Sequence, residues 1–265
     1  MSAPVAEAAA VLATARLARG RFPGFAQDLH PADEAAGYAV QDALHAALTA
    51  AGAGPWAGHK IGCTTQVMQD YLGIRNPSAG GVLAGEVHAS PARVAPRGTT
   101  RLGVECEVAV RLAHDLPGGA CTVEAAAAAV GSCMASIELV EDRYADYPSL
   151  DAPTLIADDF FGAGLVLGPE HAGFDPRALA GATATMAIDG AEVGAGRGAD
   201  ILGDPLVALA WLADALAARG RCLQAGEVVT LGSLVATHWV EPGMRIRVVN
   251  DPLGEVVLEV ADPTG

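Results

Sequence analysis

Two carboxylates two residues apart, Glu105 and Glu107, lie within the apolar, valine-rich segment 101–110. This composition predicts a strand, in which alternate side chains project to the same face. Like charges on one buried face repel and lose hydration, so they need compensation. A hard divalent cation is the simplest candidate, because Mg²⁺ is usually held by one or two carboxylates with water and substrate oxygens. Two acids on a solvated strand face are the alternative that the spacing leaves open.

A third acid, Glu138, lies in another apolar and strand-like segment, residues 134–141. Three carboxylates from two strands could hold one side of a metal ion and leave open positions for a bidentate substrate. The spacing alone does not bring Glu138 to the first pair. Glu141 and Asp142 follow at the expected strand end, where solvation explains them more simply.

The only lysine of the chain, Lys60, lies in the glycine-bounded segment 58–62. A cation nearby and loss of hydration would both lower the pKa of this lysine, which would suit it to proton transfer. The alternative is a surface lysine that caps a turn.

Two glycine-containing segments could contact a substrate. The glycines at 194–199 fit neither the dinucleotide pattern nor the phosphate-binding loop, and we expect a tight turn that places Arg197. At the end of a predicted strand, Gly232 and Ser233 would allow backbone N–H groups to approach a carboxylate, although an ordinary turn explains them equally well. No paired-histidine pattern and no Gly-x-Ser-x-Gly motif is present.

The composition excludes several classes of partner. The net charge of −15 argues against nucleic acid and anionic membranes, which both require a basic surface. No apolar segment approaches the roughly 18 residues of a membrane span, and the N-terminus lacks the pattern of a signal peptide. The five cysteines show no Cys-x-x-Cys pairing, so neither zinc nor a disulfide framework is expected, and we expect a cytoplasmic protein with reduced thiols.

The order of the expected elements indicates an α+β fold. Residues 4–19 and 31–52 have helical patterns, and short β-like segments separated by glycine and proline follow from residue 56. Few helices interrupt these segments, which favours a mixed β roll or barrel over a doubly wound parallel sheet. We therefore expect a small helical N-terminal region, 1–55, and a catalytic mixed β-roll domain, 56–265.

Several segments together resemble the 2-keto-4-pentenoate hydratase and 4-oxalocrotonate decarboxylase group of the fumarylacetoacetase superfamily. They occur in the order of the family and with its spacing, from about residue 36 to the C-terminus. Each is short, and jointly they are specific to the group but not to one reaction within it. The matching segments are residues 58–64, 72–74, 105–109, 137–140, 196–206, 210–212 and 231–233.

The resemblance implies a fold with a helical N-terminal part and a C-terminal mixed β roll of the fumarylacetoacetase type. It implies a site for Mg²⁺ or Mn²⁺ made by three acidic side chains, which match Glu105, Glu107 and Glu138 here. The lysine of the family segment matches Lys60. Relatives form homo-oligomers and complexes with partner enzymes of the same catabolic route, so both are expected by analogy.

Two positions depart from the family pattern. Many relatives carry an acidic residue shortly after the Leu-Gly-x segment, where this chain has residues 76–80 around Ser78. Relatives often have a small hydroxyl residue after an Ala-Asp-Asn segment, where this chain has Phe161 in the segment 157–162. Both positions lie near the substrate in relatives, so these departures bear on the substrate tail and on the reaction.

The leading hypothesis is a metal-dependent hydratase of aromatic catabolism, a hydro-lyase that adds water at C4 of a 2-hydroxydienoate to give a 4-hydroxy-2-oxo acid. The substrate is then a small anionic 2-oxo acid, which Arg197, Gly232 and Ser233 would help to hold. Alternatives on the same site are decarboxylation of a 2-oxo diacid and hydrolysis of an acylpyruvate. The hydrolase needs a histidine–carboxylate pair, for which His30 with Asp33 or Glu34 is the nearest candidate. A catalytically silent partner subunit that keeps the fold and the metal is a further alternative.

Overall fold

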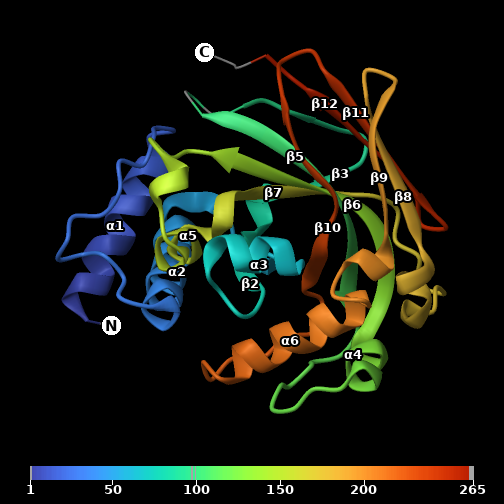
Figure 1. The fold of residues 1–265 in the computed structure, drawn as a ribbon, viewed down its shortest axis with the longest axis horizontal. Helices are drawn as coiled ribbons and strands as arrows, with labels where there is room; N and C mark the ends of the chain where they lie inside the picture. Colours follow the sequence, from blue (N-terminus) through green and yellow to red (C-terminus); the bar gives the residue numbers. More distant parts are fainter. Residues whose placement is uncertain (1, 97, 99, 263–265) are drawn as a thin grey trace.

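The computed structural model describes residues 2–96, 98 and 100–262 of the chain. Its centre is a large mixed sheet that curls into a half-barrel. The long strands β5, β6 and β10 form the middle of this sheet (Figure 1). The strands in spatial order are β2 (Ser78–Leu83), β1 (Trp56–Gly62), β10 (Val228–Val240), β5 (Arg101–Leu112), β6 (Val130–Asp142), β7 (Gly162–Leu167) and β3 (Val87–Ala89).

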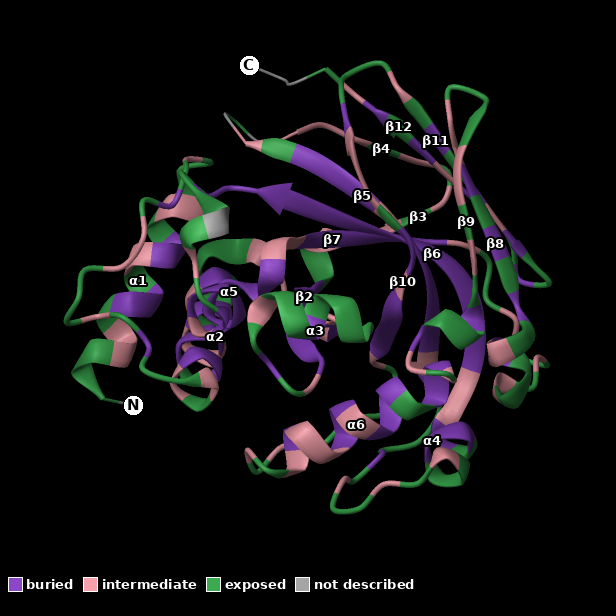
Figure 2. Ribbon diagram, in the orientation of Figure 1, coloured by how far each residue is buried: buried purple, intermediate pink, exposed green. Residues whose placement is uncertain are grey.

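A smaller mixed sheet packs beside the ends of the long strands (Figure 1). Burial alternates along its strand β11, as expected of a sheet with one face on the core and one in solvent. Figure 2 shows this contrast, because most of β6 is buried whereas β8 and β11 alternate. The strands in spatial order are β4 (Ala92–Val94), β12 (Gly254–Val260), β11 (Arg245–Asp251), β8 (Thr183–Ile188) and β9 (Ala191–Arg197).

Helices cover two sides of the large sheet. One apolar stripe of the second helix is buried. The first turn of this helix is capped by Asp33, which accepts a 2.8 Å hydrogen bond from the N–H of Ala36. This helix packs against the first helix and against α5. The helices are α1 (Ala3–Leu17), α2 (Glu34–Leu48), α3 (Gln66–Leu72), α4 (Val123–Ala129), α5 (Ala152–Ala157) and α6 (Pro205–Ala217). Short helical turns are η1 (Thr49–Ala53), η2 (Ala84–Glu86), η3 (Tyr147–Ser149), η4 (Asp159–Phe161), η5 (Pro176–Gly181) and η6 (Gly198–Asp200).

This architecture confirms the predicted α+β class, with N-terminal helices followed by a curled mixed sheet. The helical segment ends at Ala53 and the first strand begins at Trp56, next to the expected boundary. The division into two domains, 1–55 and 56–265, stays a prediction. Among the described residues, no helix is long and apolar enough to cross a membrane.

The glycine-rich turn expected at residues 194–199 is confined to the short turn η6, which begins after Arg197, and the earlier part of the segment is strand. Gly194 and Gly196 lie inside strand β9, which packs closely on β10. A Cβ atom on Gly194 would lie 2.3 Å from a methyl carbon of Val235, and one on Gly196 would lie 2.0 Å from the carbonyl oxygen of Leu234. These glycines permit close packing of two strands, not a change of direction.

Candidate metal centre

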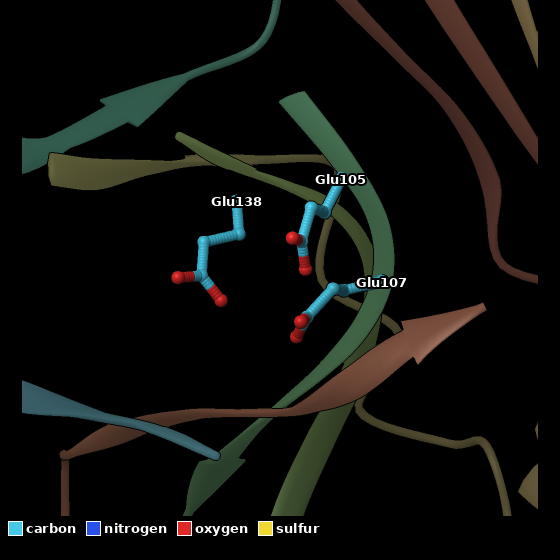
Figure 3. Close-up of side chains that lie close together, drawn as sticks. All are labelled: Glu105, Glu107 and Glu138. Atoms are coloured by element: carbon cyan, nitrogen blue, oxygen red, sulfur yellow. The ribbon is translucent and has the colours of Figure 1, made fainter. Parts of the chain in front are cut away.

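The pairing of β5 with β6 brings the three predicted carboxylates together. Glu105 lies directly opposite Glu138 in this antiparallel pair, and Glu107 follows on the same face of β5. Directly opposite residues have Cβ atoms about 5 Å apart, so the register alone makes the carboxylates neighbours. One oxygen from each lies within 4.8 Å of the others, and the side chains point toward one another (Figure 3).

Burial and mutual repulsion make these carboxylates difficult to ionise. Glu107 and Glu138 are 1 % and 2 % exposed, whereas Glu105 is half-buried. Burial, followed by the charges of Glu138 and Glu105, raises the pKa of Glu107 well above its usual range. The pKa of Glu138 is also raised, chiefly by burial and despite the opposing charge of Lys60. An arrangement of this kind is costly unless a cation offsets it.

Few donors compensate the carboxylate oxygens. The N–H of Gly232 donates a 3.2 Å hydrogen bond to Oε2 of Glu107, and the hydroxyl of Thr237 donates to Oε1 of Glu105. Among the described residues, the buried Oε1 of Glu138 has only the ammonium of Lys60 beside it, at 3.1 Å. The cluster thus presents acceptor oxygens that lack donors, which fits a site for a divalent cation.

Lys60 reaches this cluster from strand β1. Its Nζ lies 3.1 Å from Oε1 of Glu138 and donates a 2.7 Å hydrogen bond to the carbonyl oxygen of Phe160. Burial would lower the pKa of this lysine, but the charges of Glu138 and Glu105 outweigh burial, and the net pKa is raised. A lowered pKa was predicted from burial and a nearby cation alone, without these carboxylates. In the protein chain alone, Lys60 is an ammonium at neutral pH.

The charges of the cluster do not balance. When all three carboxylates are ionised, one ammonium leaves an excess of two negative charges, the number that one divalent cation neutralises. Buried charges persist in proteins when they are paired or when they coordinate a metal. The donor set of oxygen ligands is the type preferred by Mg²⁺, Mn²⁺ and Ca²⁺ over softer metals.

A cavity of about 730 Å³ opens from Glu105, Glu138 and Lys60. Most of its remaining wall is apolar, and two of its aromatic residues, Tyr71 and Tyr147, are partly exposed and therefore lie at the mouth. Among the described residues that line the cavity, Lys60 is the only basic side chain, and the charged residue outside the cluster, Asp200, is acidic. Other apolar residues that line it are Met68, Leu155, Phe161 and Trp239.

The predicted substrate-binding residues are placed differently from one another. Ser233 lines the cavity, but its hydroxyl donates a 2.5 Å hydrogen bond to the carbonyl of Val235. Gly232 lies at an irregularity of β10, where its N–H serves Glu107 and not an open site. Arg197 is exposed at the end of β9 and is not among the residues that line the cavity.

The two departures from the family pattern also lie near Lys60. Phe161 lines the cavity, whereas Ser78 is 1 % exposed and its hydroxyl donates to Sγ of Cys63 at 3.6 Å. The pair proposed for a hydrolase does not form: His30 lies 3.3 Å from Asp151, Asp33 caps α2, and Glu34 accepts from Asn76.

Sequence reasoning missed two groups that shape the site. Thr237 supports Glu105 from β10, and the carbonyl of Phe160 holds Lys60. No local signal marks either group, because Thr237 depends on strand pairing and the carbonyl depends on a turn.

Comparison with known proteins agrees with this geometry. The family model described as fumarylacetoacetate (FAA) hydrolase C-terminal matches residues 70–261. The chain belongs to the fumarylacetoacetate hydrolase family. This membership confirms the resemblance inferred from the motifs. The matched residues include all three carboxylates but not Lys60 or the N-terminal helices.

Individual relatives of the family are similar over most of the chain. A 2-keto-4-pentenoate hydratase from Dechloromonas aromatica is 34 % identical and covers 94 % of this chain and 95 % of its own. A 2-hydroxyhexa-2,4-dienoate hydratase from Comamonas testosteroni is 31 % identical over 77 % and 78 % of the two chains. The structure of 4-oxalocrotonate decarboxylase from Pseudomonas putida G7, complexed with magnesium and adipate, superposes with a TM-score of 0.91 at 25 % identity, covering 97 % of each chain.

Proposed function

We propose that this protein is a divalent-metal-dependent hydratase, a hydro-lyase that adds water to a 2-hydroxydienoate with one carboxylate and an apolar tail. The observation that carries the proposal is the contrast within one cavity. At one end lie the three carboxylates and an ammonium, and the rest of the described lining is mainly apolar, with a few hydroxyl side chains and Asp200 but no second basic group. Hydratases among the relatives support the same reaction class.

In this proposal Glu105, Glu107 and Glu138 hold the divalent cation, for which Mg²⁺ and Mn²⁺ are the candidates. When bound, the cation would act as a Lewis acid toward the oxygens of the 2-oxo acid end. The Thr237 hydroxyl and the Gly232 N–H orient two of the carboxylates. Support for a divalent cation comes from the excess of two negative charges and from the magnesium complex of the related decarboxylase.

Lys60 is the proposed proton carrier. Its ammonium lies between Oε1 of Glu138 and the Phe160 carbonyl, at the polar end of the cavity. From there the ammonium can donate a hydrogen bond to the C2 oxygen, give one proton to the carbon chain, and regain a proton from the C2 hydroxyl as negative charge develops on that oxygen. The aromatic and aliphatic wall would accommodate the tail of the substrate.

A decarboxylase of a 2-oxo diacid is the second candidate, since a relative of high structural similarity has that activity. Such a substrate has a second carboxylate, which needs a basic side chain or a set of N–H donors where it binds. The described lining provides no basic side chain there and adds the acidic Asp200, so the cavity favours the hydratase. The hydrolase loses support because His30 and its partner Asp151 are not among the described residues that line the cavity.

Purified protein with Mg²⁺ should be assayed against 2-hydroxypenta-2,4-dienoate and against 4-oxalocrotonate. We expect consumption of the dienoate and formation of a 4-hydroxy-2-oxo acid, with little CO₂ from the diacid. CO₂ release from the diacid with an inert dienoate would select the decarboxylase. Loss of neither compound, with Mg²⁺ bound, would select a silent partner subunit. A homo-oligomer and a complex with a partner enzyme also remain predictions, which sedimentation and co-purification test.

A further inference from the structure

The turn that touches Lys60 has an unusual backbone. Asp159, Phe160 and Phe161 have φ angles of +59°, +46° and +66°, the left-handed region that residues with a side chain rarely adopt. Three such residues in succession cost free energy, so the surrounding structure must hold them. The bonds that hold this turn therefore show what the fold uses it for.

The Asp159 carboxylate is bound from three elements. Oδ2 accepts a 2.8 Å hydrogen bond from Nη2 of Arg16 on α1, and Oδ1 accepts a 2.9 Å bond from the N–H of Gly81 on β2. Nε2 of His45 on α2 lies 2.8 Å and 2.9 Å from the two oxygens, and it must be the donor, because an ionised carboxylate only accepts. Asp159 is 1 % exposed, so these bonds form out of water.

Two arginines clamp the preceding residue. Arg16 and Arg143 donate through Nε to the two oxygens of Asp158, at 2.7 Å and 2.8 Å, and both also donate to its backbone carbonyl. Arg143 donates further to the carbonyl of Gly162, at 3.0 Å. The turn is thus fixed by guanidinium groups at both of its ends, and each arginine uses one N–H on the Asp158 carboxylate and another on its backbone carbonyl.

The opposite side of the turn faces the site. The Phe160 carbonyl accepts the hydrogen bond from Lys60 Nζ, and the lysine stem has little room to move. A Cβ atom on Gly80 would lie 3.0 Å from Cε of Lys60 and 3.1 Å from the carbonyl oxygen of Asp159. A shift of the turn would therefore displace both the acceptor of the ammonium and the channel that confines its stem.

We propose that Arg16 and Asp159 are positioning residues that fix the ammonium of Lys60 through the left-handed turn. The N-terminal helix α1 would then serve the reaction, although it lies before the family-matched residues 70–261 and Arg16 does not line the cavity. The role of Lys60 as proton carrier rests on the proposed function. The positioning itself depends only on the contacts of the chain.

The test uses the fact that Lys60 is the only lysine. Labelling lysine with ¹³C at Cε and ¹⁵N at Nζ gives a single side-chain signal by nuclear magnetic resonance, which reports this ammonium directly. The variant is Arg16→Met, which removes the guanidinium and keeps an apolar stem. Its matched control is Arg111→Met, which breaks the Arg111–Glu170 pair at 2.9 Å. The side chains of this pair are 35 % and 42 % exposed.

In Arg16→Met we expect the lysine signal to move or broaden, whereas the control keeps the wild-type signal. We also expect kcat to fall roughly tenfold to hundredfold at a temperature well below the unfolding transition, with KM changed by less than about threefold. A merely structural role would lower the unfolding temperature but leave the signal and kcat of the folded protein unchanged. That result in a folded Arg16→Met would overturn the proposal.

If Arg16→Met does not fold, Asp159→Asn supplies the same two measurements, because asparagine keeps the shape of the side chain and an acceptor for Gly81. The lysine signal also separates two kinds of failure. A protein that turns over no dienoate but whose lysine signal moves in the variants would contradict the proposed function and support the positioning. An active wild type whose variants keep the lysine signal and kcat would support the proposed function and contradict the positioning.

Discussion

Two buried groups of charged residues lie on either side of the turn 159–161, and they differ in how the chain pairs their carboxylates. In the arginine cluster each carboxylate lies within 3.4 Å of a guanidinium nitrogen, so the protein itself pairs every one of them. In the carboxylate cluster only Glu138 has such a partner among the described residues, the ammonium of Lys60. The arginine cluster comprises Arg16, Arg143, Glu141, Asp158 and Asp159, and the carboxylate cluster comprises Glu105, Glu107, Glu138 and Lys60.

The pKa shifts show what the difference means. Burial raises the pKa of Asp159, but His45 and Arg16 outweigh burial and the net pKa is well below its usual range. Burial and like charges both raise the pKa of Glu107. The folded chain therefore stabilises the Asp159 carboxylate as an anion, whereas the Glu107 carboxylate requires a bound cation for the same stabilisation. Buried carboxylates that all pair with cationic groups of the chain indicate a structural role here, whereas carboxylates that chiefly face one another indicate a binding site.

The largest expected effect comes from the only cation of the carboxylate cluster. Lys60→Met should lower kcat by roughly 100- to 10,000-fold, the range typical for loss of a general acid or base. Affinity for Mg²⁺ should be retained, because the three carboxylate ligands remain. Steady-state kinetics and calorimetry measure the two quantities. A fully active variant would remove Lys60 from the mechanism.

The next effect concerns a metal ligand. Glu107→Gln should weaken Mg²⁺ binding by roughly a hundredfold or more, because a neutral amide replaces one of the few charged ligands on which Mg²⁺ depends. Glutamine can still accept the hydrogen bond from Gly232, so the fold should persist. Calorimetric titration with Mg²⁺ gives the affinity, and an affinity equal to that of the wild type would refute the assignment.

Substitution in the arginine cluster should lower the free energy of unfolding. Asp159→Asn should reduce the free energy of unfolding by roughly 3 to 5 kcal/mol, because it leaves the buried Arg16 without one of its counter-charges. Urea unfolding monitored by circular dichroism measures this loss. The exposed pair Arg177–Asp175 provides a control, since Asp175→Asn should cost at most roughly 1 kcal/mol. Equal effects of the two substitutions would contradict the role given to the arginine cluster.

The smallest expected effect is a pH dependence. The pKa of Asp159 is lower in the folded chain than in the unfolded chain, where aspartate titrates near pH 4. Its contribution to stability is therefore complete above about pH 4 and is lost as the pH falls further. The difference in unfolding temperature between the wild type and Asp159→Asn should be constant from pH 7 to pH 5 and narrow below about pH 4. A difference in unfolding temperature that widens below about pH 4 would contradict the lowered pKa of Asp159.

The sequence predicted those features that depend on local periodicity. Glu105 and Glu107 share a face because alternation along a strand is fixed, and the stripe of α2 follows from the helical repeat. The arrival of Glu138 opposite Glu105 depends on the register of two strands, which no local pattern encodes. The family resemblance supplied that step.

Features that depend on distant pairs or on very short elements could not be predicted. Arg16, Arg143 and Asp158 are far apart along the chain, and their cluster exists only through packing. The helices α3 and α5, of seven and six residues, are too short for a helical pattern to emerge. The glycines of β9 were misread because close packing and turning favour the same residue.

The central claim is that unbalanced charge makes the carboxylate cluster a cation site. Thermal unfolding of the wild type and of Glu107→Gln, each in a chelator and in Mg²⁺, tests it most directly. With the chelator at neutral pH, we predict a higher unfolding temperature for Glu107→Gln, because it removes a carboxylate that the fold disfavours as an anion. Mg²⁺ should raise the unfolding temperature of the wild type and leave that of the variant nearly unchanged. A variant that is less stable in the chelator, together with an equal response of both proteins to Mg²⁺, would contradict the account.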